Sequence, residues 1–531
     1  MDELAAAVAD ALETDAEEFT RRARAEVEAI LAEIESGTFD NPQGCVGLEY
    51  EFYAVEEPGA GVDRSGEPAA LARVPRRLLE YVGFEKELGL HNAEMSTQPE
   101  PFTEQGVRAQ GASVRARLSA AGEPMRASGL RLVSDGVWTR APTGSTATEY
   151  LDASAVHDGI RLASNMSSAP RYHAMSNTGT DAMAMRVDLP HATVEADTIM
   201  PVALTTSVQP HYQLPRAREL PAHFRYAVRV AGPLLALAAN SPLLPADCYD
   251  DPTAESVSED GWAAHRVPLF EGTLNPPGPD GGGYVGTPDE TDVPEGPERG
   301  KVRFPRDVDS VRTALERIAT DETVVPMPVS PHDRFDDDFA HFRLKHGTYW
   351  RWVRPVFGGA SRTAANARIE FRPLGGQPTV RDTVALQATF AGLLVGLVRA
   401  DHPVSELPWS VARRNFYAAA RDGLDADLTW IDATGEETAD AARLYDDLFE
   451  HAAVGLRAQG FSDGAVGEIL QVLRERVDRG VTPASWKLDR MEAHLTDGAS
   501  VPGAIAATHR DYVDHQRGTL LDGSFLDWLS E

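Results

Sequence analysis

Two glutamates share one face of a predicted strand near the start of the chain. Residues 46–55 alternate like a β-strand, in which successive side chains point to opposite faces. Glu49 and Glu51 therefore lie on one face, and the apolar residues between and beside them lie on the other. Two such carboxylates repel each other and resist desolvation. The pattern indicates either a solvent-exposed acidic face or a site that holds a cation or moves a proton.

Three later strand-like segments also place polar groups on one face. They cover residues 91–97, 205–214 and 366–373. The polar side chains that share a face are Glu94 in the first, then Ser207, Gln209, His211 and Gln213, and finally Arg368, Glu370 and Arg372. Pro210 lacks a backbone N–H, so we expect the second of these strands to lie at a sheet edge or to carry a bulge there.

The residue types in these segments favour one kind of chemistry. Ligand sets rich in oxygen select Mg²⁺ or Mn²⁺ over zinc. Arginine binds phosphate oxygens in bidentate fashion, and Arg354 adds a further guanidinium upstream of the last segment. Together they predict a magnesium–polyphosphate site, most simply one for ATP. Each segment also has a structural reading, such as an exposed glutamate, a structural histidine or a surface Arg–Glu–Arg network.

Composition limits the possible partners. The chain has 531 residues and a formal net charge of −32. Its only lysines are Lys86, Lys301, Lys345 and Lys487. An acid-rich, lysine-poor surface suits a salt-rich cytoplasm, where screening removes self-repulsion, so we interpret the charge as halophilic adaptation. It argues against nucleic-acid binding, which requires a basic face.

Redox and targeting signals are sparse. Cys45 and Cys248 provide neither a disulfide framework nor a cysteine metal site. The N-terminus lacks a basic signal-peptide region, and no apolar run approaches membrane-spanning length. We therefore expect a soluble cytoplasmic protein that acts on small molecules without a membrane partner.

The order of elements favours an α+β fold. Strands carry the segments with chemical potential, helices flank them, and the chain from about residue 380 onward has helical periodicity. Residues 270–300 are rich in proline, glycine and acid, which predicts a surface loop. We expect a catalytic domain over residues 1–404 and a helical extension over 405–531 packed on it.

Four segments, in order, resemble one family. They resemble conserved stretches of the plant-type and related bacterial glutamate–cysteine ligases, in the glutamine-synthetase-like carboxylate–amine ligase superfamily. The segments are Gly47-Leu48-Glu49-Tyr50-Glu51-Phe52, Pro170-Arg171-Tyr172-His173-Ala174-Met175, Thr206-Ser207-Val208-Gln209-Pro210-His211 and Arg368-Ile369-Glu370-Phe371-Arg372. They span residues 46 to 378. Pro210 and His211 replace the usual valine and asparagine of the third segment.

The resemblance implies a curved, mainly antiparallel sheet that forms a funnel for ATP, glutamate and Mg²⁺ or Mn²⁺. The implied metal ligands are Glu49, Glu51, Glu94 and Glu370. The implied nucleotide-side residues are Gln209, His211 and Arg368. Arg372 and Arg354 would face phosphate or substrate carboxylate, and Arg171 and Tyr172 would lie near the substrate.

The resemblance leaves the amine acceptor open. The leading hypothesis is an ATP-dependent ligase that joins glutamate to cysteine through a γ-glutamyl phosphate. One alternative is a ligase of the same superfamily with a different amine, and another is a relative that binds nucleotide or amino acid without catalysis. A metal-dependent hydrolase is disfavoured, because the sequence has no His-x-x-x-His or aspartate-rich dinuclear motif. The sequence does not define the oligomeric state.

Overall fold

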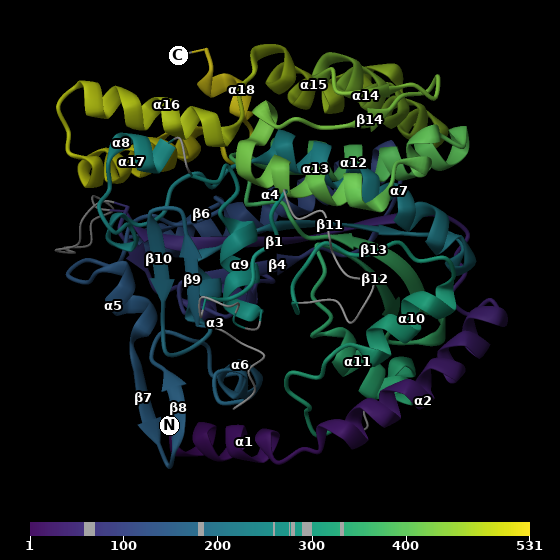
Figure 1. Cartoon of the computed structure of the whole chain (residues 1–531), viewed down its shortest axis with the longest axis horizontal. Helices are drawn as coiled ribbons and strands as arrows, with labels where there is room; N and C mark the ends of the chain where they lie inside the picture. Colours follow the sequence, from purple (N-terminus) through teal and green to yellow (C-terminus); the bar gives the residue numbers. More distant parts are fainter. Residues whose placement is uncertain are drawn as a thin grey trace.

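An antiparallel sheet forms the centre of the molecule (Figure 1). The computed structural model describes residues 1–57, 69–178, 185–258, 261–275, 277, 282–288, 300–329 and 334–530. The strands along the sheet, in spatial order, are β12 (Val353–Gly358), β13 (Asn366–Phe371), β11 (Val208–Gln213), β1 (Cys45–Glu56), β4 (Asn92–Ser96) and β3 (Glu85–Lys86). The short strands β2 (Leu71–Ala72), β5 (Glu100–Pro101) and β6 (Leu130–Val133) also pair with β1. Because the long β1 changes partners along its length, the sheet curls into a half-barrel.

Helices cover the convex face of this half-barrel. They include α4 (Glu104–Ala127), α7 (Leu220–Ala238), α12 (Val380–Ala400), α13 (Trp409–Asp422), α14 (Ala441–Ala458), α15 (Asp463–Arg479), α16 (Pro483–Thr496) and α17 (Val501–Thr519). Figure 1 shows the C-terminal helices stacked above the sheet. The ring of Phe371 on β13 stacks on Phe390 of α12, with centroids 4.7 Å apart. The predicted α+β fold with a curved antiparallel sheet and a helical C-terminal region is confirmed.

The concave face of the sheet is bordered by shorter elements. These include α6 (Pro170–Met175), α9 (Arg266–Leu274), α10 (Val311–Thr320) and α11 (Ala340–His346). The N-terminal helices α1 (Asp2–Leu12) and α2 (Ala16–Glu35) run along the end of the molecule opposite the C-terminal helices (Figure 1). The concave face is thus left for the side chains of β1, β4, β11 and β12.

Strand β11 is interior, and it accommodates Pro210 with a shift in register. His211 pairs with Glu370 of β13, whereas Ser207 bridges Gly375. Residues 211 to 207 on one side face residues 370 to 375 on the other, so this ladder has a bulge opposite Pro210, with the extra residue on the segment that continues β13. The pairing of β11 with β1 stays regular through Pro210. Of the two predicted solutions, the bulge is correct and the sheet edge is wrong.

The predicted surface loop over residues 270–300 starts later than expected. Residues 270–274 complete helix α9, and Glu271, Thr273 and Asn275 are fully buried. Residues 276, 278–281 and 289–299 lie outside the described part of the chain. The prediction was wrong for residues 270–274. The polar residues of this short helix are buried, but in the sequence they cannot be told from the polar residues of a surface loop.

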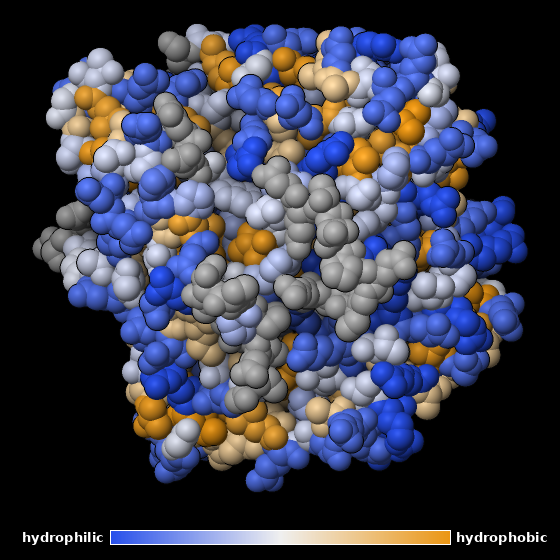
Figure 2. Space-filling model, in the orientation of Figure 1, coloured by the Kyte–Doolittle hydropathy of each residue, from blue (hydrophilic) through white to orange (hydrophobic). Residues whose placement is uncertain are grey.

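Hydrophilic residues dominate the face of the molecule drawn in Figure 2. The apolar patches on this face are small and separate. Helix α12 is the one described helix long and apolar enough to span a membrane, but 72% of its apolar window is buried inside the structure. It therefore acts as a core helix here.

Candidate active site

A cavity of about 200 Å³ lies on the concave face of the sheet. Its lining includes most of the predicted site residues, which are Glu49, Glu51, Glu94, Arg171, Tyr172, Gln209, Arg354 and Arg372. His211, Glu370 and Arg368 lie outside the lining, next to Glu49 at one end. Segments far apart in sequence therefore converge on one site.

Carboxylates form one wall of this cavity. Glu51 of β1 pairs directly with Glu94 of β4, and Glu87 lines the cavity next to them. Burial, followed by the charges of Glu87 and Glu49, raises the pKa of Glu94 well above its usual value. Burial and the charge of Glu51 raise the pKa of Glu87 to about 7. These carboxylates lack enough positive charge nearby, and such a wall suits a bound cation.

Glu370 lies just outside the lining, next to Glu49 and between two arginines that line the cavity. Its carboxylate accepts from Arg354 Nε at 3.0 Å and from Arg372. Burial alone would raise the pKa of Glu370, but Arg354 and Arg372 hold it well below its usual value. Glu370 therefore stays ionised and fixes both guanidinium groups at the cavity edge.

Glu49, His211 and Glu370 form a compact group. One ligand atom of each lies within 4.8 Å of the other two, and His211 Nε2 is 3.4 Å from Glu49 Oε1. Arg368 Nε donates to the opposite ring nitrogen of His211 at 3.2 Å. Arg368 thus touches the group through His211 and does not reach the cavity. Because Nδ1 accepts from Arg368, Nε2 of His211 carries the proton and faces Glu49 as a donor. The two carboxylates of this group are the oxygen ligands that it can offer a divalent cation.

Gln209 connects β11 to the acidic wall. Its Nε2 donates to Glu51 Oε1 at 3.0 Å and to Ser207 Oγ at 3.1 Å. This bond fixes the Glu51 carboxylate, and it leaves Gln209 Oε1 buried without a partner.

Arg171 and Tyr172 reach the cavity from α6. Burial lowers the pKa of Arg171, whose Nε and Nη2 atoms are buried and find no partner among the described residues. Trp350 and Phe270 add aromatic surface to this part of the lining. A buried guanidinium with free donors, next to aromatic rings, suits the carboxylate end of a small substrate.

Two lining residues were missed from the sequence. Glu87 stands in the charged stretch Glu85-Lys86-Glu87, which resembles a surface turn. Arg266 begins helix α9, is 2% exposed, and burial lowers its pKa to about 10. Arg266 stands in a mainly apolar stretch of the sequence, and this was the one feature that could have marked it as a buried functional residue. Neither Glu87 nor Arg266 lies on a strand whose side chains alternate with a period of two.

The residues present fit a divalent cation together with an anionic ligand. Buried atoms without hydrogen-bond partners in the described chain include Gln209 Oε1, Arg171 Nε and Arg266 Nε. Unsatisfied buried acceptors and donors of this kind are costly unless a ligand completes them. The acidic wall supplies oxygen ligands, and the arginines supply donors for phosphate or carboxylate.

A second histidine–aspartate group lies among the C-terminal helices. His402, Asp447 and His451 come within 4.8 Å of one another. The Asp447 carboxylate already accepts from Trp430 Nε1 at 2.6 Å and from the Ala433 N–H at 3.3 Å. Unlike the carboxylates of the cavity, this single carboxylate is satisfied by N–H donors. We therefore interpret this group as structural.

The comparison with protein families places the chain among ATP-dependent carboxylate–amine ligases, a class that the acidic and arginine-lined cavity fits. More particularly, the model of the glutamate–cysteine ligase family 2 matches residues 45–514, and the chain belongs to this family. No curated protein is similar in sequence at a significant level.

Solved structures give distant similarities. Glutamate–cysteine ligase from Francisella tularensis in complex with AMP is 12% identical, with 90% of this chain and 94% of that chain covered and a TM-score of 0.47. A bifunctional glutathione synthetase from Pasteurella multocida is 13% identical over 92% of this chain and 55% of that chain, with a TM-score of 0.47. The complex of the ubiquitin-like protein Pup with its ligase PafA gives 10% identity, coverage of 90% and 73%, and a TM-score of 0.37.

Proposed function

We propose that this protein is a glutamate–cysteine ligase that uses ATP and Mg²⁺ or Mn²⁺ to form γ-glutamylcysteine. The observation that carries the proposal is the single cavity with an acidic wall on β1 and β4 and arginines at its other end, in a chain of this family. In the proposal, Glu49, Glu51, Glu94 and Glu370 are metal ligands, and Glu87 joins them. Gln209 and His211 act on the nucleotide side, and Arg368 holds His211 in place.

The proposed reaction has two steps. An oxygen of the glutamate γ-carboxylate attacks the γ-phosphorus of ATP, and ADP leaves. The cysteine amine then attacks the acyl carbon, the C–O bond to phosphate breaks, and the nitrogen loses a proton. When bound, the divalent cation would neutralise charge on the phosphate oxygens.

The protein's own contribution is positioning and charge. Arg354 and Arg372, held by Glu370, direct their N–H groups toward developing negative charge. Arg171 and Tyr172 orient the substrate carboxylate. Neither step requires a side-chain nucleophile.

The test is phosphate release from ATP with Mg²⁺ and glutamate, measured with and without cysteine. It is run at high salt, because we also propose that the acid-rich, lysine-poor composition reflects a halophilic cytoplasm. Phosphate release that depends on cysteine, with a γ-glutamyl product identified by mass, supports the proposal. Release only with another amine supports the same-class alternative, and binding of ATP without turnover supports a non-catalytic relative.

A further inference from the structure

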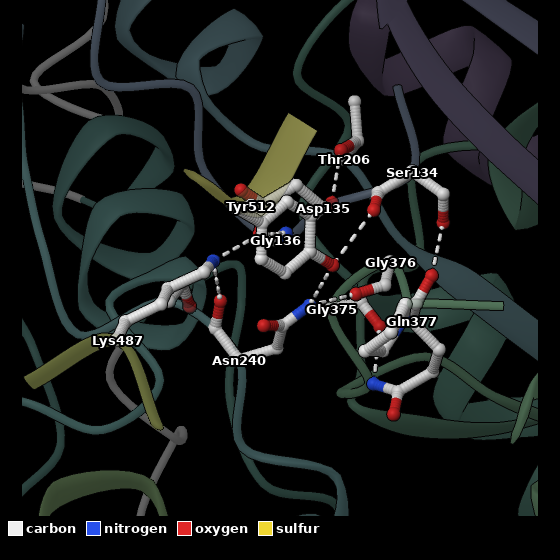
Figure 3. A network of polar contacts seen from close by, with 12 residues as sticks. Ser134, Asp135, Gly136, Thr206, Asn240, Gly375, Gly376, Gln377, Lys487 and Tyr512 are labelled. Carbon is white, nitrogen blue, oxygen red and sulfur yellow. Dashed lines mark hydrogen bonds and ion pairs between the residues drawn. The ribbon is translucent and has the colours of Figure 1, made fainter. Parts of the chain in front are cut away.

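Lys487 is buried where the C-terminal helices meet the turn after β6, far along the chain from the strands that carry the cavity. It lies on α16, is 5% exposed, and pairs with Asp135, which is 1% exposed (Figure 3). Its Nζ also donates to the Asn240 carbonyl at 2.7 Å and lies 4.3 Å from the centre of the Tyr512 ring. An ion pair so deeply buried is retained only if its partners are well placed.

The Asp135 turn holds Thr206, which lies two residues before the start of β11. Thr206 N donates to the Gly136 carbonyl at 3.0 Å, and Thr206 Oγ1 donates to the Asp135 carbonyl. On its other side, Gly376 N donates to the Thr206 carbonyl at 3.2 Å. Figure 3 shows these three backbone segments meeting at the ion pair. A Cβ on Gly376 would lie 2.3 Å from the Asp135 carbonyl oxygen, so the close approach requires glycine.

The next residues lead directly into the cavity. The Ser207 carbonyl accepts from Glu51 N at 2.9 Å. The Ser207 hydroxyl accepts from Gln209, whose amide also donates to the Glu51 carboxylate. The segment that Asp135 fixes therefore fixes both the backbone and the side chain of Glu51.

Helix α17 supports the same turn. Tyr512 Oη donates to the Ser134 carbonyl at 2.9 Å, and Gln516 Nε2 donates to it at 2.7 Å. The family match includes α16 and extends to residue 514, within α17. The C-terminal helices thus touch the backbone of the site without reaching the cavity.

We propose that Lys487 is a positioning residue of the ligase site, which acts through Asp135 and Thr206 on Gln209 and Glu51. The C-terminal helices α16 and α17 are then a working part of the catalytic unit. The catalytic consequence rests on the proposed function, whereas the effect on cation binding can be tested without it.

The experiment compares three variants of the full chain. Lys487→Met keeps the aliphatic stem against Tyr512 and removes the ammonium group. Lys487→Met with Asp135→Asn also removes the stranded carboxylate, which preserves the fold. Leu448→Ala is the control, because Leu448 is fully buried in α14 and its truncation destabilises the same helical layer without contact to the Asp135 turn. The readouts are the thermal midpoint, Mn²⁺ affinity by calorimetry, and kcat and KM.

We expect both Lys487 variants to bind Mn²⁺ about 10- to 100-fold more weakly and to lose kcat by a similar factor, as is typical when a group that orients a metal ligand is removed. The double variant regains most of the thermal midpoint but not the affinity. Leu448→Ala loses thermal stability and keeps Mn²⁺ affinity. Wild-type Mn²⁺ affinity in the double variant, or an equal loss of affinity in Leu448→Ala, would overturn the proposal. If the wild type forms no γ-glutamyl product, the Mn²⁺ comparison still decides it.

Discussion

Replacing Glu94 with glutamine separates the stability of the metal-free protein from its ability to bind a cation. Glu94 pairs with Glu51 across two antiparallel strands, where directly opposed Cβ atoms lie about 5 Å apart. Two charges at about 5 Å repel by roughly 3 kcal/mol at an effective dielectric constant of 20, and by under about 1 kcal/mol in bulk water. Because Glu94 is only half-buried, we expect a value between these limits. Burial, then the charges of Glu87 and Glu49, and then this repulsion from Glu51 raise the pKa of Glu94 well above its usual value.

Glu94→Gln should therefore leave the metal-free protein almost unchanged. Burial and the neighbouring carboxylates raise the pKa of Glu94 and so favour its protonated form, and glutamine has nearly the shape and charge of that form. We expect the free energy of unfolding without metal to change by less than about 0.5 kcal/mol, as for an ordinary surface substitution.

Cation binding should respond strongly to the same change. With Mn²⁺ at about 100 times its Kd, the wild type gains about 2.7 kcal/mol of stability. If the substitution weakens binding about 100-fold, the gain at that concentration falls to about 0.4 kcal/mol. Turnover should fall with it, because the cation is expected to neutralise the transferring phosphate.

The assay is urea unfolding at high salt and pH 7, with and without Mn²⁺. Glu85→Gln is the matched control, because Glu85 pairs with Glu94 from β3 but is exposed and does not line the cavity. The control should keep the full gain from Mn²⁺. A Glu94→Gln variant with wild-type stabilisation by Mn²⁺ would refute the assignment of Glu94 as a ligand.

Three further predictions concern single residues. Glu51→Gln should abolish turnover with the fold intact by circular dichroism, and near-normal activity would exclude Glu51 from the metal site. Arg171→Met should raise KM for an anionic substrate about 10- to 100-fold in steady-state kinetics, because a hydrogen bond to a charged group contributes about 1.5–3 kcal/mol. An unchanged KM would contradict the proposed role of Arg171 in substrate binding. Burial raises the pKa of Glu271 to about 7, so the folded state holds a proton that the unfolded chain releases near pH 4.5. Stability should then fall by about 2 kcal/mol from pH 5 to pH 7 and level off above about pH 8. Glu271→Gln should remove this slope in urea titrations, and a parallel slope in the variant would disprove the assignment.

The acidic strands could be predicted because they obey a local rule. In β1 the side chains alternate so that Glu49 and Glu51 face the cavity while Tyr50 and Phe52 are buried on the opposite side. The period of two is encoded in the sequence, and one buried face fixes the register.

Residues outside that periodicity could not be found in the same way. Glu87 reaches the cavity from a charged turn, and Arg266 from the start of a short helix, so only the tertiary fold brings them to the acidic wall. The bond of Lys487 to Asp135 joins residues that are hundreds of positions apart. The helical periodicity of the C-terminal region predicted its secondary structure, but it carried no information on which turn those helices would hold.

The distribution of charge in the cavity also restricts what can bind there. The carboxylates on β1 and β4 repel one another. At the other end, burial and, to a smaller extent, the charge of Arg354 lower the pKa of Arg171. A lone cation would relieve only the acidic wall, and a lone anion only the arginines. A divalent cation bound to a polyphosphate reduces the repulsion at both ends of the cavity. Its positive charge lies against the carboxylates, and its negative charge lies against the arginines. The same arrangement disfavours an uncharged ligand, which would leave both repulsions in place.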